Sequence, residues 1–159
     1  MDHAVLLREV AELDLQEFYS HQKAKYTVAA APVNLTDLTA FFERWRKILD
    51  EPKYKTRTIV AEGQVVGYIG QFLRNDQPEV SYELGKQHWG KGFATSALRQ
   101  FLREVAMRPL YARVAKDNSG SIRVLQKCGF SVIGEDRFVA ALGHEVEEFI
   151  FALAEPGSG

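Results

Sequence analysis

The sequence of 159 residues predicts a single α+β domain in which helices flank a mixed β-sheet. Short segments that alternate apolar and polar residues are interleaved with segments of helical periodicity. They follow one another in the order β-α-α-β-β-β-α-β-α-β-β. No linker, repeat or low-complexity tract divides the chain. We therefore expect one domain over residues 1–155, followed by a flexible tail over residues 156–159.

The first third of the chain predicts one strand and two helices. A short strand over residues 5–9 precedes a helix over residues 11–22, while residues 23–35 follow neither period. The face of the first helix carries Leu13, Phe18 and Tyr19. A second helix begins at Thr36, a residue type that caps helices, and Asp37 suits the positive end of its dipole. Its apolar face carries Phe41, Phe42, Trp45, Ile48 and Leu49.

The middle of the chain is rich in strands. Residues 58–61 and 64–69 flank the dipeptide Glu62-Gly63, which is typical of a hairpin turn. A further strand covers residues 79–84 and ends at Gly85.

The second half predicts two more helices and three more strands. A helix begins near Lys91 or Gly92 and ends before Pro109, and its buried side recurs at Phe93, Ala97, Phe101 and Val105. Residues 110–115 alternate and predict a strand. Asp117, Asn118 and Ser119 cap a helix that runs to Lys127 and stops at Gly129. Residues 130–134 and 145–153 are the last predicted strands.

Composition excludes several classes of protein. A formal net charge of −1 lacks the basic surplus of a nucleic-acid binder. The single cysteine, Cys128, excludes an internal disulfide and a zinc site built from several thiolates, and its place before Gly129-Phe130 indicates a core residue. No apolar run is long enough to cross a bilayer, and the first residues lack the pattern of a secretory signal. We therefore expect a cytoplasmic protein without a membrane partner.

A glycine-rich turn is the strongest local signal. Gly90 and Gly92 lie between the strand over residues 79–84 and the following helix. The first amides of a helix have no intrahelical partner, and the helix dipole adds partial positive charge, so this turn suits a diphosphate. Two common nucleotide motifs do not fit. The dinucleotide fingerprint lacks its third glycine, and Lys91 is followed by Gly92 instead of serine or threonine. The pattern alone leaves open a tight turn without a ligand.

Two sequence blocks resemble the GNAT superfamily of acetyltransferases. Gln87, Gly90 and Gly92 match the cofactor signature of that family, and the flanking Tyr82-Glu83-Leu84 and Trp89 to Thr95 resemble its ribosomal-protein N-acetyltransferase-like branch. A second block, from Asn118 through Ser121 to Lys127 and Gly129-Phe130, follows at the expected spacing. The strong resemblance covers roughly residues 57–153.

The resemblance implies an architecture and a cofactor. The sheet would be mostly antiparallel, with its fourth and fifth strands parallel and splayed apart. Acetyl-CoA would place its pantetheine arm in that gap, and no metal would be required. The residues implied in cofactor binding are Leu84, Gln87, His88, Trp89, Gly90, Lys91, Gly92, Phe93, Ala94, Thr95, Asn118 and Ser121.

The resemblance also implies N-acetyl transfer to a primary amine, either a protein N-terminus or a small molecule. The amine must lose a proton before it attacks the thioester, and Glu83 and Glu79 are the candidate bases, with His88 as a third. A backbone N–H near Leu84 would meet the developing oxyanion. Many family members carry a tyrosine where this chain has Leu125, so Ser121 is the candidate donor to the departing thiolate. Ser121 could equally be an ordinary serine in the first turn of a helix. Asn118 could be only a helix cap, but the second block favours cofactor contact for it.

The acceptor region is less well determined. It would lie against the first two helices, where His21, Lys23, Lys25, Tyr26 and Trp45 occur, although His21 and His144 also fit ordinary surface histidines. Carboxylates that could make an acidic cleft are Asp76, Glu79, Glu83, Glu145, Glu147 and Glu148. Two alternatives stay open: an acyl-CoA-binding module without turnover, and an interaction domain without a cofactor. A homodimer through the C-terminal strands is a further expectation from the resemblance.

Overall fold

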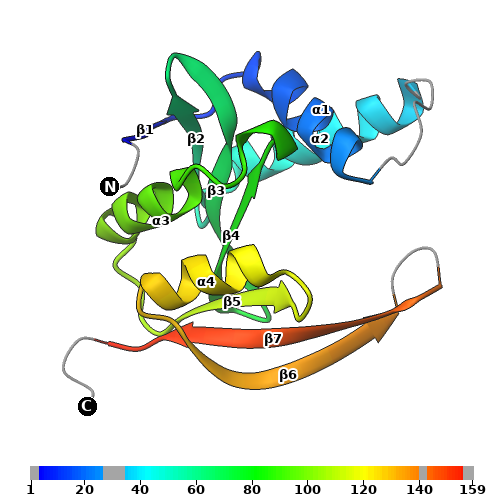
Figure 1. Ribbon diagram of the computed structural model, residues 1–159. Coiled ribbons are helices and arrows are strands. Elements are labelled where there is room, and N and C mark those ends of the chain that lie inside the picture. Colours follow the sequence, from blue (N-terminus) through cyan, green and yellow to red (C-terminus); the bar gives the residue numbers. More distant parts are fainter. Residues whose placement is uncertain (1–3, 27–34, 140–142, 156–159) are drawn as a thin grey trace.

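A computed structural model describes residues 4–26, 35–139 and 143–155. Its elements are β1 Leu6–Arg8, α1 Asp14–Tyr26, α2 Leu35–Asp50, β2 Lys55–Ala61, β3 Gln64–Arg74, β4 Gln77–Leu84, the 3-10 helix η1 Lys86–His88, α3 Phe93–Glu104, β5 Leu110–Ala115, α4 Ser119–Lys127, β6 Ser131–Val139 and β7 Glu145–Leu153. Figure 1 shows this order along the chain. The predicted sequence of strands and helices is confirmed, and η1 is an addition. Over the described residues, no helix combines the length and apolarity that crossing a membrane requires.

One mixed sheet of seven strands organises the domain, in the order β1-β2-β3-β4-β5-β7-β6. All recorded pairs are antiparallel except β4 with β5, which run parallel and pair at Glu79 and Tyr111. Beyond this point the two strands separate toward Leu84 and Ala115, as the ribbons in Figure 1 show. The predicted splay between the fourth and fifth strands is therefore confirmed.

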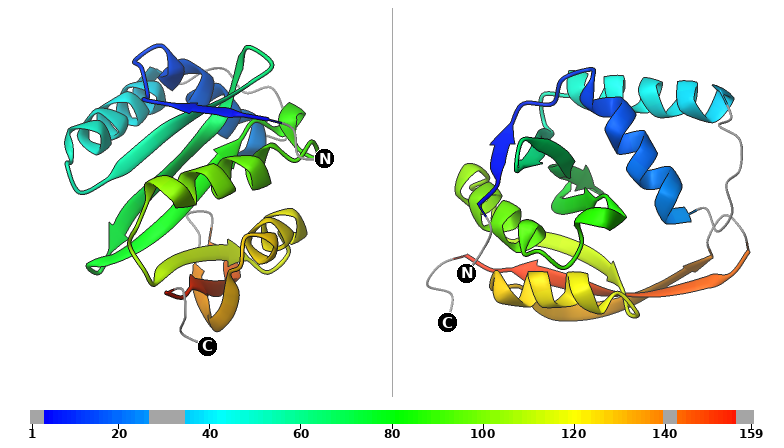
Figure 2. Two further views of the ribbon diagram at one scale, coloured as in Figure 1. Left: turned by 90° about the vertical axis from the view of Figure 1, so that its left-hand side faces the viewer. Right: turned by 45° about the horizontal axis from the view of Figure 1, so that its top comes forward.

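Helices cover the two faces of the sheet separately. α3 and α4 bury Phe101, Leu98 and Leu125 against one face, in the larger of two apolar clusters. α1 and α2 form the smaller cluster on the other face, where Phe18 and Trp45 pack against Tyr68 of β3 with ring centroids 5.2 and 4.8 Å away. Figure 2 shows the two helix pairs as separate layers.

The start of α1 differs from the prediction. It begins at Asp14, so Leu13 precedes the helix and is 83% exposed. The Asp14 carboxylate accepts hydrogen bonds from Arg8, from the Ala11 amide and from the Thr58 hydroxyl. Contacts with β1 and β2 thus set the start of α1, and periodicity within residues 11–22 could not reveal them. The smaller cluster contains Leu15 in place of the expected Leu13.

Strands also extend further than predicted. β3 continues to Arg74 and β6 to Val139, because each keeps an antiparallel partner along its hairpin. Residues 135–139 of β6 have no strong alternation of their own, but each is paired with β7. The pairing partner, rather than local propensity, decides the length of these strands.

Two buried histidines join α1 to η1. The rings of His21 and His88, which are 5% and 8% exposed, meet edge to face with centroids 5.9 Å apart. Within the described part of the chain, neither ring nitrogen of His21 has a hydrogen-bond partner, and Glu17 Oε2 lies 3.9 Å from Nε2. A Cβ atom at Gly85 would lie 2.7 Å from His21 Nε2, so glycine allows the ring to pack on the backbone. The interpretation of His21 as a surface histidine is therefore wrong.

Burial should make stability depend on the pH through His21. Desolvation lowers the pKa of His21 below its ordinary value of about 6.5, although Glu17 opposes this. Below that pH the unfolded chain binds a proton more readily than the folded protein. The contribution of neutral His21 to the free energy of unfolding is therefore fully present above about pH 6.5. It is lost as the pH drops toward the folded-state pKa, by at most about 1.4 kcal/mol per pH unit.

Urea unfolding at about pH 7.5 and about pH 5.5 tests this expectation. The variant His21→Leu should lose less stability than the wild type between the two pH values. His144→Leu is the control, because His144 is exposed, and it should keep the wild-type pH dependence. Identical losses in His21→Leu and the wild type would contradict the expectation.

Candidate active site

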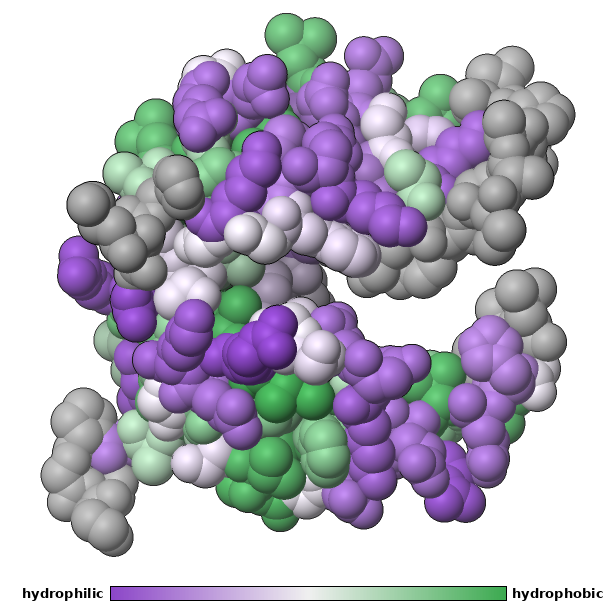
Figure 3. Space-filling view, viewed as in Figure 1, coloured by the Kyte–Doolittle hydropathy of each residue, from purple (hydrophilic) through white to green (hydrophobic). Residues whose placement is uncertain are grey.

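A cavity of about 1250 Å³ occupies the space where β4 and β5 separate. Its walls come from the end of β4, the turn before α3, the start of α3, the inner side of α4 and the β6–β7 hairpin. Figure 3 shows the surface hollowed between the part built on β1–β4 and the part built on β5–β7. Its lining residues belong to both faces of the sheet, and they define one end on the α3 and α4 face and another on the α1 and α2 face.

The first end is formed by the glycine turn. Gly90 and Gly92 have φ values of +76° and +80°, which favour glycine over other residues. Gly92 is the N-cap of α3, and no side chain caps the helix there. The first intrahelical bond runs from Ser96 N to Gly92 O, so the amides of residues 93–95 precede it and point out of the helix. A Cβ atom at Gly90 would meet nothing within 4 Å, which leaves room for an anion against the backbone.

Basic side chains add to this end. Arg123 and Lys127 of α4 both line the cavity, and they lie one helical turn apart. The spacing of four residues was a usable signal that the sequence interpretation did not exploit. Asn118, which was predicted to contact the cofactor, lines the cavity and also accepts a hydrogen bond from the Ser121 amide as the N-cap of α4. The position of Asn118 is thus compatible with both predicted roles, a helix cap and a cofactor contact.

The backbone of β4 faces the gap. Gly85 N donates to Val66 O at 2.9 Å, which makes Gly67 and Leu84 a pair without direct hydrogen bonds to one another. The Leu84 amide therefore points away from β3 and toward the gap, where an oxyanion donor was expected. The Leu84 carbonyl accepts a hydrogen bond from Trp89 Nε1 at 3.1 Å, which ties the turn to the strand.

Tyr82 is a lining residue that the sequence interpretation missed. Its side chain points to the α3 and α4 face, and its hydroxyl lies 3.4 Å from the Ser121 carbonyl of α4. Burial raises the pKa of Tyr82 to about 12, so the hydroxyl keeps its proton at neutral pH. Leu125, at the position where many family members carry a tyrosine, is fully buried and carries no donor.

The second end of the cavity lies on the α1 and α2 face. Successive strand residues point to opposite faces, so Glu83 points away from the α3 side that Tyr82 occupies. Glu83 lines the cavity, and its Oε1 atom is shielded from solvent. Phe138 of β6 and Val146 and Glu148 of β7 line the same end, together with His144. These partners were not predicted as one group, because they come from a hairpin distant in sequence.

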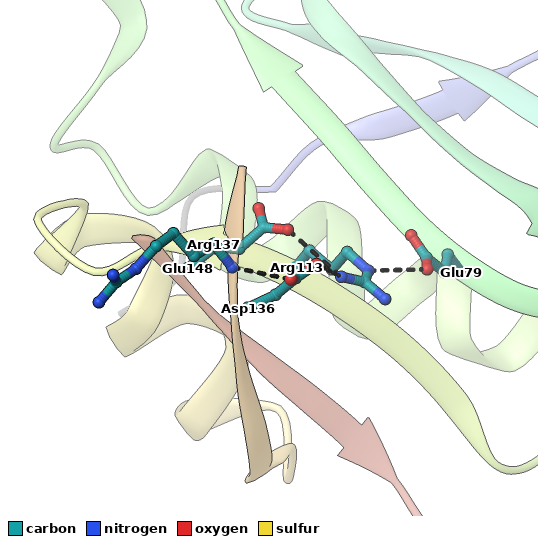
Figure 4. A network of polar contacts seen from close by, with 5 residues as sticks. All are labelled: Glu79, Arg113, Asp136, Arg137 and Glu148. Carbon is teal, nitrogen blue, oxygen red and sulfur yellow. Dashed lines mark hydrogen bonds and ion pairs between the residues drawn. The ribbon is translucent and has the colours of Figure 1, made fainter. Parts of the chain in front are cut away.

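Arg113 connects four strands below this end, as Figure 4 shows. From β5 its Nε lies 3.2 Å from Glu79 Oε2 on β4, and its Nη1 lies 2.6 Å from Asp136 Oδ2 on β6 and 3.4 Å from Glu148 Oε1 on β7. The Arg113–Glu79 contact spans the splayed strands next to their recorded pair. Glu79 is thus held in an ion pair and does not line the cavity.

Most of the other predicted site residues line the cavity, and some do not. The described lining includes Glu83 and Ser121 and the predicted cofactor residues Leu84, His88, Trp89, Gly90, Gly92, Phe93, Ala94, Thr95 and Asn118. It does not include Gln87 or Lys91. Trp45 is 4% exposed in the smaller core, so it does not line an acceptor region. The side chains of Lys25 and Tyr26 lie outside the described part of the structure.

The remaining predicted carboxylates and Cys128 do not line the cavity. Glu145 and Glu147 pair with Arg137 on the exposed side of the β6–β7 hairpin, and Asp76 lies in the turn between β3 and β4. Cys128 is partly buried and packs against the larger core, in agreement with the prediction. Among the described residues, no group of three or more His, Cys, Asp or Glu side chains could hold a metal ion.

Comparisons with known proteins agree with this geometry. Residues 4–131 match the family described as "Acetyltransferase (GNAT) domain". An uncharacterized N-acetyltransferase p20 of Bacillus licheniformis is 31% identical over 98 residues, a segment that covers 57% of this chain and 55% of that protein. This chain therefore matches only about half the length of that relative.

Solved structures share the fold at low identity. The microcin C7 self-immunity acetyltransferase MccE, determined with acetyl-CoA and AMP, is 20% identical, with a TM-score of 0.75 over 96% of this chain and 93% of that chain. A ribosomal-protein-alanine N-acetyltransferase from Brucella melitensis is 21% identical, with a TM-score of 0.71 over 94% of this chain and 99% of that chain. Acetyl-CoA is the cofactor of the matched family. The chain belongs to the GNAT acetyltransferase family.

Proposed function

We propose that this protein transfers the acetyl group of acetyl-CoA to a primary amine by direct attack. The observation that carries the proposal is the continuity of the cavity, which joins an anion-binding turn on one face of the sheet to a shielded carboxylate, Glu83, on the other. The basic end, with residues 90–95, Arg123 and Lys127, suits the phosphates of CoA. The motif between Tyr82 and Thr95 also supports the ribosomal-protein N-acetyltransferase-like branch.

Each step has a residue suited to it. Glu83 accepts a proton from the amine, which approaches from the α1 and α2 face. The Leu84 amide donates to the oxygen that gains negative charge during attack. On the opposite face, the Ser121 hydroxyl donates a hydrogen bond to the departing sulfur. The Tyr82 hydroxyl does the same once its single proton turns from the Ser121 carbonyl, its acceptor at 3.4 Å. Bound acetyl-CoA supplies the activated acetyl group. The amine and the departing thiolate thus lie toward opposite faces of the sheet.

Glu83 suits the base better than Glu79. Glu79 lies on the same side of β4, but its carboxylate is engaged by Arg113 at 3.2 Å and does not line the cavity. Glu83 lines the cavity beside the Leu84 amide. His88 also lines the cavity, but its ring packs on His21. The acyl-CoA-binding module without turnover is the second candidate function, favoured by the absence of a donor at Leu125.

The first prediction from this proposal concerns Gly90. Gly90→Leu should weaken CoA binding about tenfold or more, because the side chain occupies the space against the turn where a phosphate would lie. Gly63→Leu is a matched control, since Gly63 also has a φ of +76° and also has nothing within 4 Å of its added Cβ. Both variants should lose similar stability, and only Gly90→Leu should lose affinity in a calorimetric titration with CoA. Unchanged affinity in folded Gly90→Leu would refute the phosphate cradle.

The second prediction concerns the base. Glu83→Gln should lower kcat/KM for amine acetylation by about 10²- to 10⁴-fold, while CoA affinity stays near that of the wild type. Glu79→Gln should keep most of the activity. Thiol release from acetyl-CoA with a panel of amines measures both. If Glu79→Gln were the inactive variant, the roles given to the two carboxylates would be reversed, and no turnover by the wild type with any amine would favour the binding module.

The third prediction concerns the donors to sulfur. Tyr82→Phe should lower kcat about tenfold, because one hydrogen bond to the departing thiolate is lost. Its affinity for CoA that lacks the sulfur atom should stay at the wild-type level. Ser121→Ala, measured in the same way, shows how much the Ser121 hydroxyl contributes to kcat. An equal loss of affinity for CoA with and without sulfur would show that the Tyr82 hydroxyl only supports packing.

A further inference from the structure

We propose that Glu148, oriented by Arg113, binds a second positive charge on the acceptor, so that the preferred acceptor is a diamine or a longer polycationic amine. This inference rests on the proposed acetyl transfer and names the substrate class of the same site. Glu148 would be a specificity-determining residue, and Arg113 a positioning residue that does not touch the acceptor.

Glu148 has the placement that this role requires. It is 8% exposed, yet it lines the cavity at the end where Glu83 lies. Ala115 of β5 is its register partner, so its side chain points to the same face of the sheet as Arg113. Glu148 belongs to β7 and Glu83 to β4, so the two carboxylates approach the acceptor end from opposite sides of the gap.

The Arg113 guanidinium does not fully neutralise the Glu148 carboxylate. Arg113 is shared among three carboxylates, and the contact with Glu148, at 3.4 Å, is longer than those with Asp136 and Glu79, at 2.6 and 3.2 Å. One guanidinium and three carboxylates leave two formal negative charges. Within the described residues, Lys116 and Arg137 have Glu135, Glu145 and Glu147 as their recorded ion-pair partners, while the charge of Arg74 acts on Asp136. With Arg74 counted, the three carboxylates still exceed the two guanidinium groups by one negative charge. Excess negative charge at a nearly buried site is unfavourable until a cation arrives.

The reacting amine itself does not meet this need. It must be neutral to attack the thioester, and its proton passes to Glu83. A separate ammonium group can remain charged beside Glu148, where charge-assisted hydrogen bonds are strong. The apolar side chains of Phe138 and Val146 line the same end of the cavity and suit an aliphatic spacer between the two nitrogens.

A matched pair of acceptors tests the inference. The rates of acetylation of a linear primary monoamine and of the diamine with the same chain length are compared over a range of concentrations. Wild-type protein should prefer the diamine by about 10- to 100-fold in kcat/KM, mostly through KM, as expected for one charged hydrogen-bonded contact. Glu148→Gln should reduce that ratio to about one. Asp136→Asn is the control, because Asp136 contacts the same Arg113 but does not line the cavity, and it should retain the preference.

Direct binding separates this inference from the proposed function. Calorimetric titration of the diamine into CoA-saturated protein should show binding that Glu148→Gln weakens by a similar factor. Loss of diamine binding in Glu148→Gln without turnover of any amine by the wild type would support the charge site and refute the transferase. Equal rates for the two amines, or a ratio that Glu148→Gln leaves unchanged, would overturn the inference while leaving the transferase in place.

Discussion

The sparse contact between β4 and β5 is the constraint on which the rest of the structure depends. The two parallel strands are recorded as paired at one position, and beyond it their backbone amides and carbonyls face a gap instead of a partner strand. Backbone polar groups require hydrogen-bond partners, and a ligand with amides of its own, such as the pantetheine arm of CoA, can supply them. In the proposed function, the cofactor thus completes the sheet. Arg113 and Glu79 hold the strands together where the gap begins.

This constraint explains why the two ends of the cavity differ in charge. The end near α3 and α4 receives helix amides and basic side chains, because two helices begin or run beside it. The other end receives carboxylates from the strands on the opposite face. A molecule with an anionic tail and an electrophilic head fits this gradient in one orientation only. In the proposed function, this gradient sets the orientation of the bound acetyl-CoA.

Features encoded over a short stretch of chain could be predicted from the sequence. The glycine turn at Gly90 and Gly92, the N-cap at Asn118 and the helical face of α3 all depend on neighbouring residues, and all are present. Features that depend on distant partners could not be predicted. The start of α1 is fixed by Arg8 and Thr58, and the acceptor end is completed by a hairpin far along the chain. His21 was misjudged because periodicity does not reveal that a polar ring can pack on the backbone at Gly85.

The alternation of side chains along β4 has an evolutionary consequence. Tyr82 and Leu84 point to one face of the sheet and Glu83 between them to the other. In the proposed function the first two belong to the cofactor wall and Glu83 to the acceptor wall. Substitutions in the β6–β7 hairpin can therefore remodel one wall without disturbing the other. After gene duplication, a descendant of such a chain could acquire a new acceptor through changes at Phe138, Val146 or Glu148 and inherit the cofactor machinery intact. The pleat of one strand thus separates the proposed cofactor wall from the wall on which a new acceptor could be selected.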